Sequence, residues 1–434
     1  MFGATKWEEE LVKWDRERRK KGEEEATRER WQRVMRGKKE RQPDIAYWRK
    51  LCSFLHVGDK NWTRKQIDGV ESDVEEHLGG EDGKRSTEAR LARDGFVVCY
   101  RKREKDILTQ DLISNLRRGV LRIVDEGWPP SFIYMYDEAI VVMFRLQALV
   151  QQLSGEANIS NGDFLAWVIS PQAGHTGFSP HRDRQPTDVA ASFRADGTPK
   201  YVTCWVPLSH ATPDNSCLYV IPRPFDPGYT DGDGETSPLE VCLTRKEDYQ
   251  NVKCLACPSG SIVCFSHRII HWGSAGRPDP EVPPRISMSF AFSDASYEPP
   301  YLASDALDPL RRFALLCGQM VVYQDRFRFP REDLNYFFSA FKAGVHESAA
   351  FHPTYTAKVM KEYASFVAEL DAAGQGGITG EEVQGESEDD LDQALEAILD
   401  ANELDPCILD DFQDDFDDYV DNPPLSSDGP DADE

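Results

Sequence analysis

The stretch from residue 163 to residue 292 constrains the fold more than any other part of the chain. Short runs rich in Val, Ile, Phe and Trp alternate there with Pro, Gly, Asp and Asn. Six of these runs are FLAWVIS (164–170), YVTCWVPL (201–208), CLYVIP (217–222), LEVCL (239–243), SIVCF (261–265) and RISMSFAF (285–292). Many short strands with turn residues between them are typical of a β-sandwich or barrel such as a jelly roll.

Helical patterns flank this β region on both sides. Apolar residues recur at helical spacing in residues 107–125, and again in residues 308–323 and 333–341. Before the first of these, the segment from Gly95 to Tyr100 has the composition of a strand. We therefore predict an α+β fold in which helices flank a β core.

The net charge of -26 is concentrated at the C-terminal end. After Lys361 the chain has 25 Asp and Glu residues and no Lys or Arg, so the rest of the protein is nearly neutral. Nucleic-acid binding by the whole chain is disfavoured, because it needs a basic surface. Residues 373–434 are Gly-rich and then alternate acidic with apolar residues, so we expect a disordered acidic tail that can recruit a protein partner.

The N-terminal region is also densely charged. Residues 1–42 contain 14 Lys and Arg against 10 Asp and Glu, and Trp7, Leu11 and Trp14 share one helix face. The simpler interpretation is a solvated surface helix, and the alternative is an arm that docks on the tail or on a partner. The segment lacks the apolar stretch of a secretory signal, and no run approaches a membrane span. We expect an intracellular protein, most simply a cytoplasmic one.

The ten cysteines show no disulfide-framework spacing, and we expect them to be reduced thiols. Cys254 and Cys257 form a lone C-x-x-C, which lacks the second pair of ligands that a zinc site needs. We interpret these two cysteines as strand residues.

His181 and Asp183 form an H-x-D motif that can bind a metal. In a strand, residues two apart point to the same side, so the imidazole and the carboxylate lie together and Arg182 points away. A second histidine from a later strand completes a face of two histidines and one carboxylate, which suits Fe(II). By itself the motif is weak, because a charged surface turn has the same residues.

The segment from Ser261 to Phe292 supplies the missing groups. A strand ends in histidines, a Gly-containing turn follows, and Arg285 opens the next strand. The guanidinium of an arginine there can bind a carboxylate through two parallel hydrogen bonds. His267 and His271 compete for the ligand role. The turn after His271 and its spacing to Arg285 favour His271, which leaves His267 as a supporting or core residue.

Together these residues resemble the phytanoyl-CoA dioxygenase family of 2-oxoglutarate oxygenases. The resemblance covers about residues 88–292. It has four parts, which are Ala92–Val98, His181-Arg182-Asp183, the block from Thr203 to Pro222, and His271-Trp272-Gly273-Ser274 with Arg285. The chain departs from the family pattern after Ile221, where it reads Pro-Arg-Pro-Phe, and in long loops around the H-x-D motif.

The resemblance implies a double-stranded β-helix core of the cupin-like jelly-roll type, with Fe(II), 2-oxoglutarate and O2 as cofactor and co-substrates. His181, Asp183 and His271 would hold the metal, and Arg285 would bind 2-oxoglutarate. Ser287 or Ser289 would support the co-substrate, and parity does not separate them because both share the face of Arg285. Trp205 can line the pocket or serve as a core aromatic. The implied reaction decarboxylates 2-oxoglutarate to succinate and CO2 while a C–H bond is hydroxylated.

We expect four regions along the chain. They are a charged helical extension (1–60), an oxygenase domain (61–345) with its β-helix core at about 160–295, a helical extension (346–372) and the acidic tail (373–434). The expected substrate is a small molecule or a lipid-like acid. Two alternatives stay open, namely a non-catalytic scaffold that recruits partners through its tail, and an enzyme that acts on a macromolecule.

Overall fold

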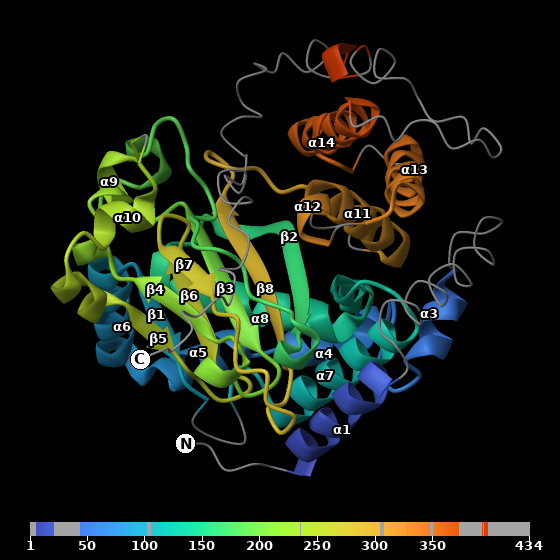
Figure 1. Ribbon diagram of the computed structural model, residues 1–434, viewed down its shortest axis with the longest axis horizontal. Helices are drawn as coiled ribbons and strands as arrows, with labels where there is room; N and C mark the ends of the chain where they lie inside the picture. The colour runs from blue at the N-terminus through green and yellow to red at the C-terminus, as the bar shows by residue number, and fades with distance from the viewer. Residues whose placement is uncertain are drawn as a thin grey trace, which may run out of the picture.

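Two antiparallel β-sheets form the centre of the protein (Figure 1). This computed structural model describes residues 6–20, 44–101, 106–234, 236–303, 308–327, 329–347, 350–372, 393 and 395–397. The larger sheet has the strand order β1-β6-β3-β8-β2, and the smaller sheet has the order β5-β4-β7. The strands are β1 (Phe96–Cys99), β2 (Asn158–Ile169), β3 (Tyr201–Pro207), β4 (Leu218–Ile221), β5 (Lys253–Leu255), β6 (Ile262–Ser266), β7 (Ile270–Gly273) and β8 (Arg285–Asp294). Antiparallel sheets combined with helices confirm the predicted α+β class.

The larger sheet is buried on both faces, because its side chains alternate between two hydrophobic clusters. On β8, the main core takes the even-numbered residues Ile286, Met288, Phe290 and Phe292. On the other face, Trp205 of β3 packs with Leu218 and Val220 of the smaller sheet. Ser289 lies directly opposite Trp205 in the β3–β8 ladder, so it shares the face toward the smaller sheet.

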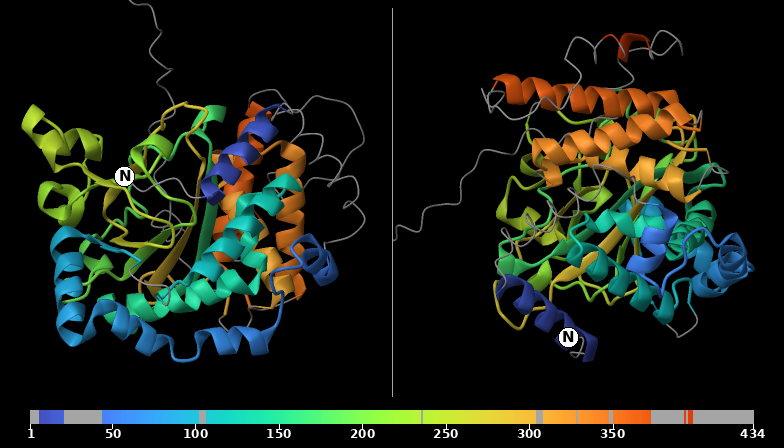
Figure 2. Two further views of the ribbon diagram at one scale, coloured as in Figure 1. Left: turned by 90° about the horizontal axis from the view of Figure 1, so that it is seen from below. Right: turned by 90° about the vertical axis from the view of Figure 1, so that its right-hand side faces the viewer.

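Many of the helices cover the outer face of the larger sheet (Figure 2), whereas the short helix of residues 238–242 packs against the smaller sheet. The helices are α1 (Lys6–Lys20), α3 (Ile45–Leu51), α4 (Lys60–Ile67), α5 (Val70–Leu78), α6 (Gly80–Asp94), α7 (Gln110–Asp125), α8 (Asp137–Ser154), α9 (Gly228–Asp231), α10 (Pro238–Cys242), α11 (Pro309–Val322), α12 (Gln324–Phe327), α13 (Arg331–Glu347) and α14 (Pro353–Ala372). The side chain of Thr109 caps α7 by accepting a hydrogen bond from the backbone N–H of Leu112. The helices expected over 107–125, 308–323 and 333–341 correspond to α7, α11 and α13.

One expected strand is a helix. The run LEVCL at 239–243 falls largely in α10, which begins at Pro238 in the segment between β4 and β5. Proline has no backbone N–H and fits the first turn of a helix, where that donor would be unpaired. The five-residue run gives no periodicity that separates a strand from a short helix, so the prediction there was wrong.

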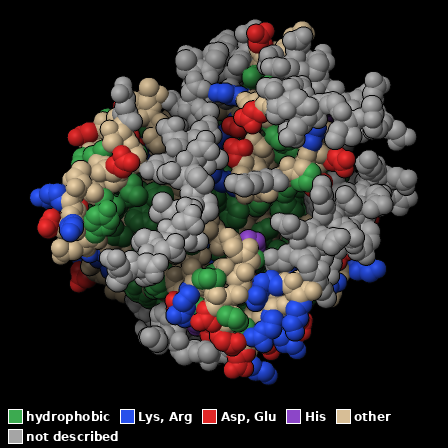
Figure 3. All heavy atoms as spheres, in the orientation of Figure 1, with side chains coloured by type: hydrophobic (Ala, Val, Ile, Leu, Met, Phe, Trp, Pro, Cys, Tyr) green, Lys and Arg blue, Asp and Glu red, His purple; other side chains and the backbone are tan. Residues whose placement is uncertain are grey.

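Helix α1 packs on the body of the protein. Leu11 is only 2% exposed and belongs to the main core, and the Trp14 indole N–H donates to the Asp125 carboxylate at 3.1 Å. Arg16 forms an ion pair with Glu281 at 2.8 Å. The interpretation as a solvated surface helix is therefore wrong for its apolar face. Its outer face belongs to a surface where Lys and Arg mix with Asp and Glu, at the lower edge of Figure 3.

Among the described helices, none is long and apolar enough to cross a membrane. The predicted acidic tail, residues 373–434, lies outside the described residues except for positions 393 and 395–397. Of these, Leu395 packs partly against the main hydrophobic core.

Candidate metal centre

His181, Asp183 and His271 converge in a pocket between the two sheets. His271 lies on β7, and His181 pairs with it through backbone hydrogen bonds of 3.0 and 2.9 Å. The Nε2 atoms of His181 and His271 lie 3.7 and 3.4 Å from the same carboxylate oxygen, Oδ1 of Asp183. One ligand atom from each residue lies within 4.8 Å of the other two. This arrangement can hold one metal ion.

Backbone carbonyls orient both imidazole rings. Nδ1 of His181 lies 2.7 Å from the carbonyl oxygen of Ser179, and Nδ1 of His271 lies 3.1 Å from that of Ile269. A carbonyl only accepts hydrogen bonds, so each Nδ1 carries the proton and each Nε2 keeps its lone pair for a metal. Burial, and then the neighbouring His271, lower the pKa of His181 well below its usual value, which favours the neutral form that binds metals.

The Asp183 carboxylate is oriented from the opposite side. The Thr203 hydroxyl on β3 donates to Oδ2 of Asp183, which leaves Oδ1 facing the two imidazoles. The backbone N–H of Asp183 donates to the carbonyl of His267 at 3.0 Å. Two imidazole nitrogens and one carboxylate oxygen on one side of a pocket fit a non-haem Fe(II) centre with open positions.

His267 does not join this group. Its side chain is fully buried, and its ring lies near Phe193, Tyr201 and Tyr297, with centroid distances of 5.6, 6.0 and 5.4 Å. Burial lowers its pKa to about 3, so the ring is neutral. The residue acts through its backbone carbonyl, which holds the Asp183 segment in place.

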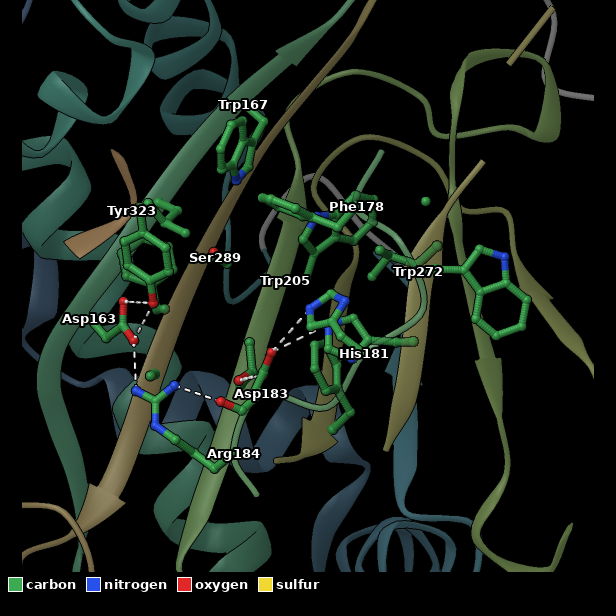
Figure 4. A pocket seen from close by; sticks show the side chains of 18 of the residues that line it. Asp163, Trp167, Phe178, His181, Asp183, Arg184, Trp205, Trp272, Ser289 and Tyr323 are labelled. Atoms are coloured by element: carbon green, nitrogen blue, oxygen red, sulfur yellow. Dashed lines mark hydrogen bonds and ion pairs between the residues drawn. The ribbon is translucent and has the colours of Figure 1, made fainter. Parts of the chain in front are cut away.

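Two buried arginines bracket Asp183, and the sequence reasoning missed their role. Arg182 pairs with Asp226 and Asp233, each at 2.6 Å. Arg184 pairs with Glu298 at 2.8 Å and Asp163 at 3.0 Å. Arg184 also donates to the backbone carbonyl of Asp183 at 2.7 Å, as Figure 4 shows.

The alternation of charge in His-Arg-Asp-Arg was the one available signal for these two arginines. A charged surface turn would have the same composition, whereas both side chains are only 1% exposed. Each guanidinium therefore sits in the interior with two carboxylates, and the pairs fix the segment that carries the ligands.

Arg285 lines the same pocket, but its surroundings differ from those of Arg182 and Arg184. Its side chain is buried, its Nε has no hydrogen-bond partner, and no carboxylate within the described residues forms an ion pair with it. Its guanidinium carbon lies 5.5 Å from the ring centre of Trp205. Burial lowers its pKa to about 10, which leaves it positively charged at neutral pH. A buried cation without an internal partner favours an anionic ligand.

The other residues expected near the co-substrate separate into two groups. Trp205 and Ser289 line the same pocket as Arg285. Ser287 is fully buried with an unpartnered hydroxyl, and it is not among the lining residues. Of the two serines, Ser289 is the one that lines the pocket, and its contact with the co-substrate stays a prediction.

A second wall of the pocket was not anticipated from the sequence. The Tyr323 hydroxyl donates to the Asp163 carboxylate at 2.9 Å, and the Trp167 ring lies edge-on to Phe178 at 4.6 Å (Figure 4). All four residues line the pocket, whose empty space is about 780 Å³ with its mouth included. Tyr323 follows α11, so the helices after the β core contribute to the pocket.

Part of the chain is similar to a known protein family. Residues 71–277 match the family model described as phytanoyl-CoA dioxygenase (PhyH), which confirms the resemblance seen in the sequence. The matched range contains the three candidate ligands and ends before Arg285. No curated protein sequence matches the chain.

Several solved structures are similar to part of this chain. The non-heme alpha ketoglutarate dependent epimerase SnoN from nogalamycin biosynthesis is 17% identical, with 49% of this chain and 82% of that chain covered and a TM-score of 0.37. AviO1 from Streptomyces viridochromogenes Tue57 is 17% identical, with 49% and 95% covered and a TM-score of 0.36. Apo EctD from S. alaskensis is 16% identical, with 49% and 77% covered and a TM-score of 0.35.

The family match and the group of three ligands agree on the cofactors. Iron and 2-oxoglutarate, with O2, are what the resemblance implies, and the donor set at His181, Asp183 and His271 fits iron. The chain therefore has the features of an iron- and 2-oxoglutarate-dependent oxygenase-type enzyme.

Proposed function

Starting from a phytanoyl-CoA dioxygenase-like domain, we propose that this protein is an Fe(II)- and 2-oxoglutarate-dependent dioxygenase. It hydroxylates a small-molecule or lipid-like substrate and releases succinate and CO2. The oxygenase unit is residues 61–345, with its β-helix core at about 160–295, between the charged extension 1–60 and the later segments 346–372 and 373–434.

One observation carries the proposal. A group of two histidines and one carboxylate shares a pocket with a buried arginine that no carboxylate of the described chain neutralises. A metal site alone would not need Arg285, and a structural arginine would be paired as Arg182 and Arg184 are. The combination supports a ligand that chelates the metal at one end and carries a carboxylate at the other.

The roles of the residues follow from their surroundings. His181, Asp183 and His271 would hold the metal, and Arg285 would bind the distal carboxylate of 2-oxoglutarate with two parallel hydrogen bonds. When bound, iron and 2-oxoglutarate supply an oxidative decarboxylation coupled to hydroxylation of a C–H bond. Thr203 and the carbonyls of Ser179 and Ile269 keep the ligand atoms aimed at the metal.

Trp205 and Ser289 would support the co-substrate beside Arg285. Leu218 and Phe265 line the same pocket, and apolar side chains around an ion pair exclude water and strengthen the contact between the arginine and the carboxylate. The substrate would enter against Trp167 and Phe178. Their aromatic surfaces favour a substrate with an apolar portion.

A second candidate function rests on the composition of the segment after Lys361, which has 25 Asp and Glu residues and no Lys or Arg. In that alternative the protein is a non-catalytic scaffold that recruits a partner through residues 373–434. A variant truncated before residue 373 separates the two functions. Full succinate production by the truncated protein would confine the tail to regulation or localisation.

The decisive test is an anaerobic titration of the purified full-length protein with Fe(II) and 2-oxoglutarate, followed by visible absorption. We expect a weak charge-transfer band that needs both additions and disappears in His181→Ala. Absence of the band in folded protein with confirmed iron content would overturn the enzyme assignment and favour the scaffold.

A further inference from the structure

Two pairs of thiols lie close together in the β core and differ in their access to solvent. The Sγ atoms of Cys217 and Cys254 are 3.4 Å apart, and those of Cys204 and Cys264 are also 3.4 Å apart. Cys254 is exposed, whereas the other three are buried. A dissolved oxidant can therefore reach the first pair and not the second.

The accessible pair lies beside the candidate co-substrate site. Cys217 directly precedes β4, and its neighbour Leu218 lines the pocket. Cys254 lies on β5, the edge strand of the smaller sheet. Cys217 also lies within electrostatic reach of Arg285. A covalent change at Cys217 would thus act on the wall that holds the buried arginine.

We propose that Cys217 and Cys254 are a thiol-oxidation site whose reversible disulfide weakens binding of 2-oxoglutarate at Arg285. The effect on 2-oxoglutarate rests on the proposed function, whereas formation of the disulfide does not. The oxidant is a hydroperoxide, and a small dithiol reverses the reaction.

The chemistry takes two balanced steps. The Cys254 sulfur attacks hydrogen peroxide, the O–O bond breaks, and a sulfenic acid and one water form. The Cys217 sulfur then attacks that sulfenic sulfur, the S–O bond breaks, and the S–S bond forms with release of a second water. The two thiols lose two electrons and two protons, and one peroxide is reduced to two waters.

The environment of each thiol decides that Cys254 is oxidised before Cys217 reacts. Burial, and then the neighbouring Cys254, raise the pKa of Cys217 well above the usual range of a thiol. Its thiolate is therefore scarce at neutral pH, and the thiolate is the nucleophile in reactions with peroxide. Cys254 is the exposed partner, so the first oxidation falls there.

The disulfide would disturb the pocket because the two sulfurs must approach one another. They are 3.4 Å apart, whereas a disulfide bond is about 2.05 Å long. Cys217 is fully buried, so its shift displaces close-packed neighbours, among them Leu218 of the pocket wall. We expect the oxidised protein to bind 2-oxoglutarate severalfold more weakly.

The test uses the full-length protein, treated with a small excess of hydrogen peroxide and then with a thiol-blocking reagent. Peptide mapping by mass spectrometry without reduction locates the crosslinks. The reduced and oxidised proteins are then titrated anaerobically with 2-oxoglutarate in the presence of Fe(II). Cys254→Ser is the control variant, because it removes only an exposed thiol. The buried pair Cys204 and Cys264 is the control within the same molecule.

The proposal predicts a crosslink between Cys217 and Cys254, none between Cys204 and Cys264, and weaker 2-oxoglutarate binding that Cys254→Ser does not show. Absence of the first crosslink, or equal formation of the second, would overturn the oxidation site. A crosslink with unchanged 2-oxoglutarate binding would overturn its effect on the pocket. Failure of the proposed function is recognised separately, because the reduced protein would then show no charge-transfer band.

Discussion

The two walls of the pocket are built in different ways. The wall with the candidate metal and co-substrate residues comes largely from strands of the two sheets, with Thr203 and Trp205 on β3, His271 on β7, and Arg285 and Ser289 on β8. Strand pairing and alternation fix where these side chains point. A short sequence pattern is therefore enough to find most of them.

The second wall combines an edge strand of the larger sheet with segments outside the sheets. Asp163 lies on β2, Phe178 lies in the loop after it, and Tyr323 follows α11. Hydrogen bonds from Arg184 and Tyr323 to Asp163 hold these segments together. Strands thus position His271 and Arg285, an isolated bridge to His271 positions His181, and the surface offered to a substrate depends also on how the segment after α11 docks.

Loss of a metal ligand should have the largest effect. We expect Asp183→Ala to abolish Fe(II)-dependent succinate production, because the only carboxylate of the ligand group is removed. Metal content and the charge-transfer band measure the loss. Retention of full activity in this variant would remove the basis for treating the first wall as a metal site.

Arg184 and Arg285 are both buried, but they should respond in opposite ways to the same substitution. Arg184→Met leaves Glu298 and Asp163 without their cation, so the free energy of unfolding should fall by about 3–5 kcal/mol. Arg285→Met removes an unpaired buried charge, so that free energy should be unchanged or higher, while 2-oxoglutarate binding is lost. Urea unfolding and the anaerobic titration measure both effects. Strong destabilisation by Arg285→Met would show that this arginine is structural.

A change that affects only the orientation of Asp183 should have an intermediate effect. Thr203→Val keeps the shape of the side chain and removes the hydroxyl that donates to Oδ2 of Asp183. We expect the affinity for Fe(II) to fall about 10- to 100-fold, as is usual when a group that orients a metal ligand is lost. An unchanged affinity would mean that the strand wall holds Asp183 without this hydrogen bond.

The smallest effect should come from the helix-derived wall. Tyr323→Phe removes the hydroxyl that donates to Asp163 and should lower the free energy of unfolding by about 1 kcal/mol. The charge-transfer band and the affinity for 2-oxoglutarate should not change, because Tyr323 is not one of the candidate metal or co-substrate ligands. A shift in either would show that the two walls are coupled.

Sequence reasoning was reliable where the relevant contacts are local. The strands that contain Trp205 and Arg285 and the helix of residues 110–125 follow from periodicity and turn residues. It failed at residues 239–243, where a five-residue apolar run gave no period to measure and Pro238 starts a helix. It also left the choice between Ser287 and Ser289 open, because parity places both on one face.

By itself, the sequence determined the α+β class, the family resemblance and the spacing of the H-x-D motif, the distal histidine and the arginine. The tertiary structure decided which groups meet. Only it shows Thr203 donating to Asp183, Tyr323 reaching Asp163, and Arg182 and Arg184 paired with carboxylates while Arg285 pairs with none among the described residues. The physical reason is the separation of the partners along the chain. Side-chain alternation relates residues that are a few positions apart, whereas these partners lie 20 to 160 positions apart.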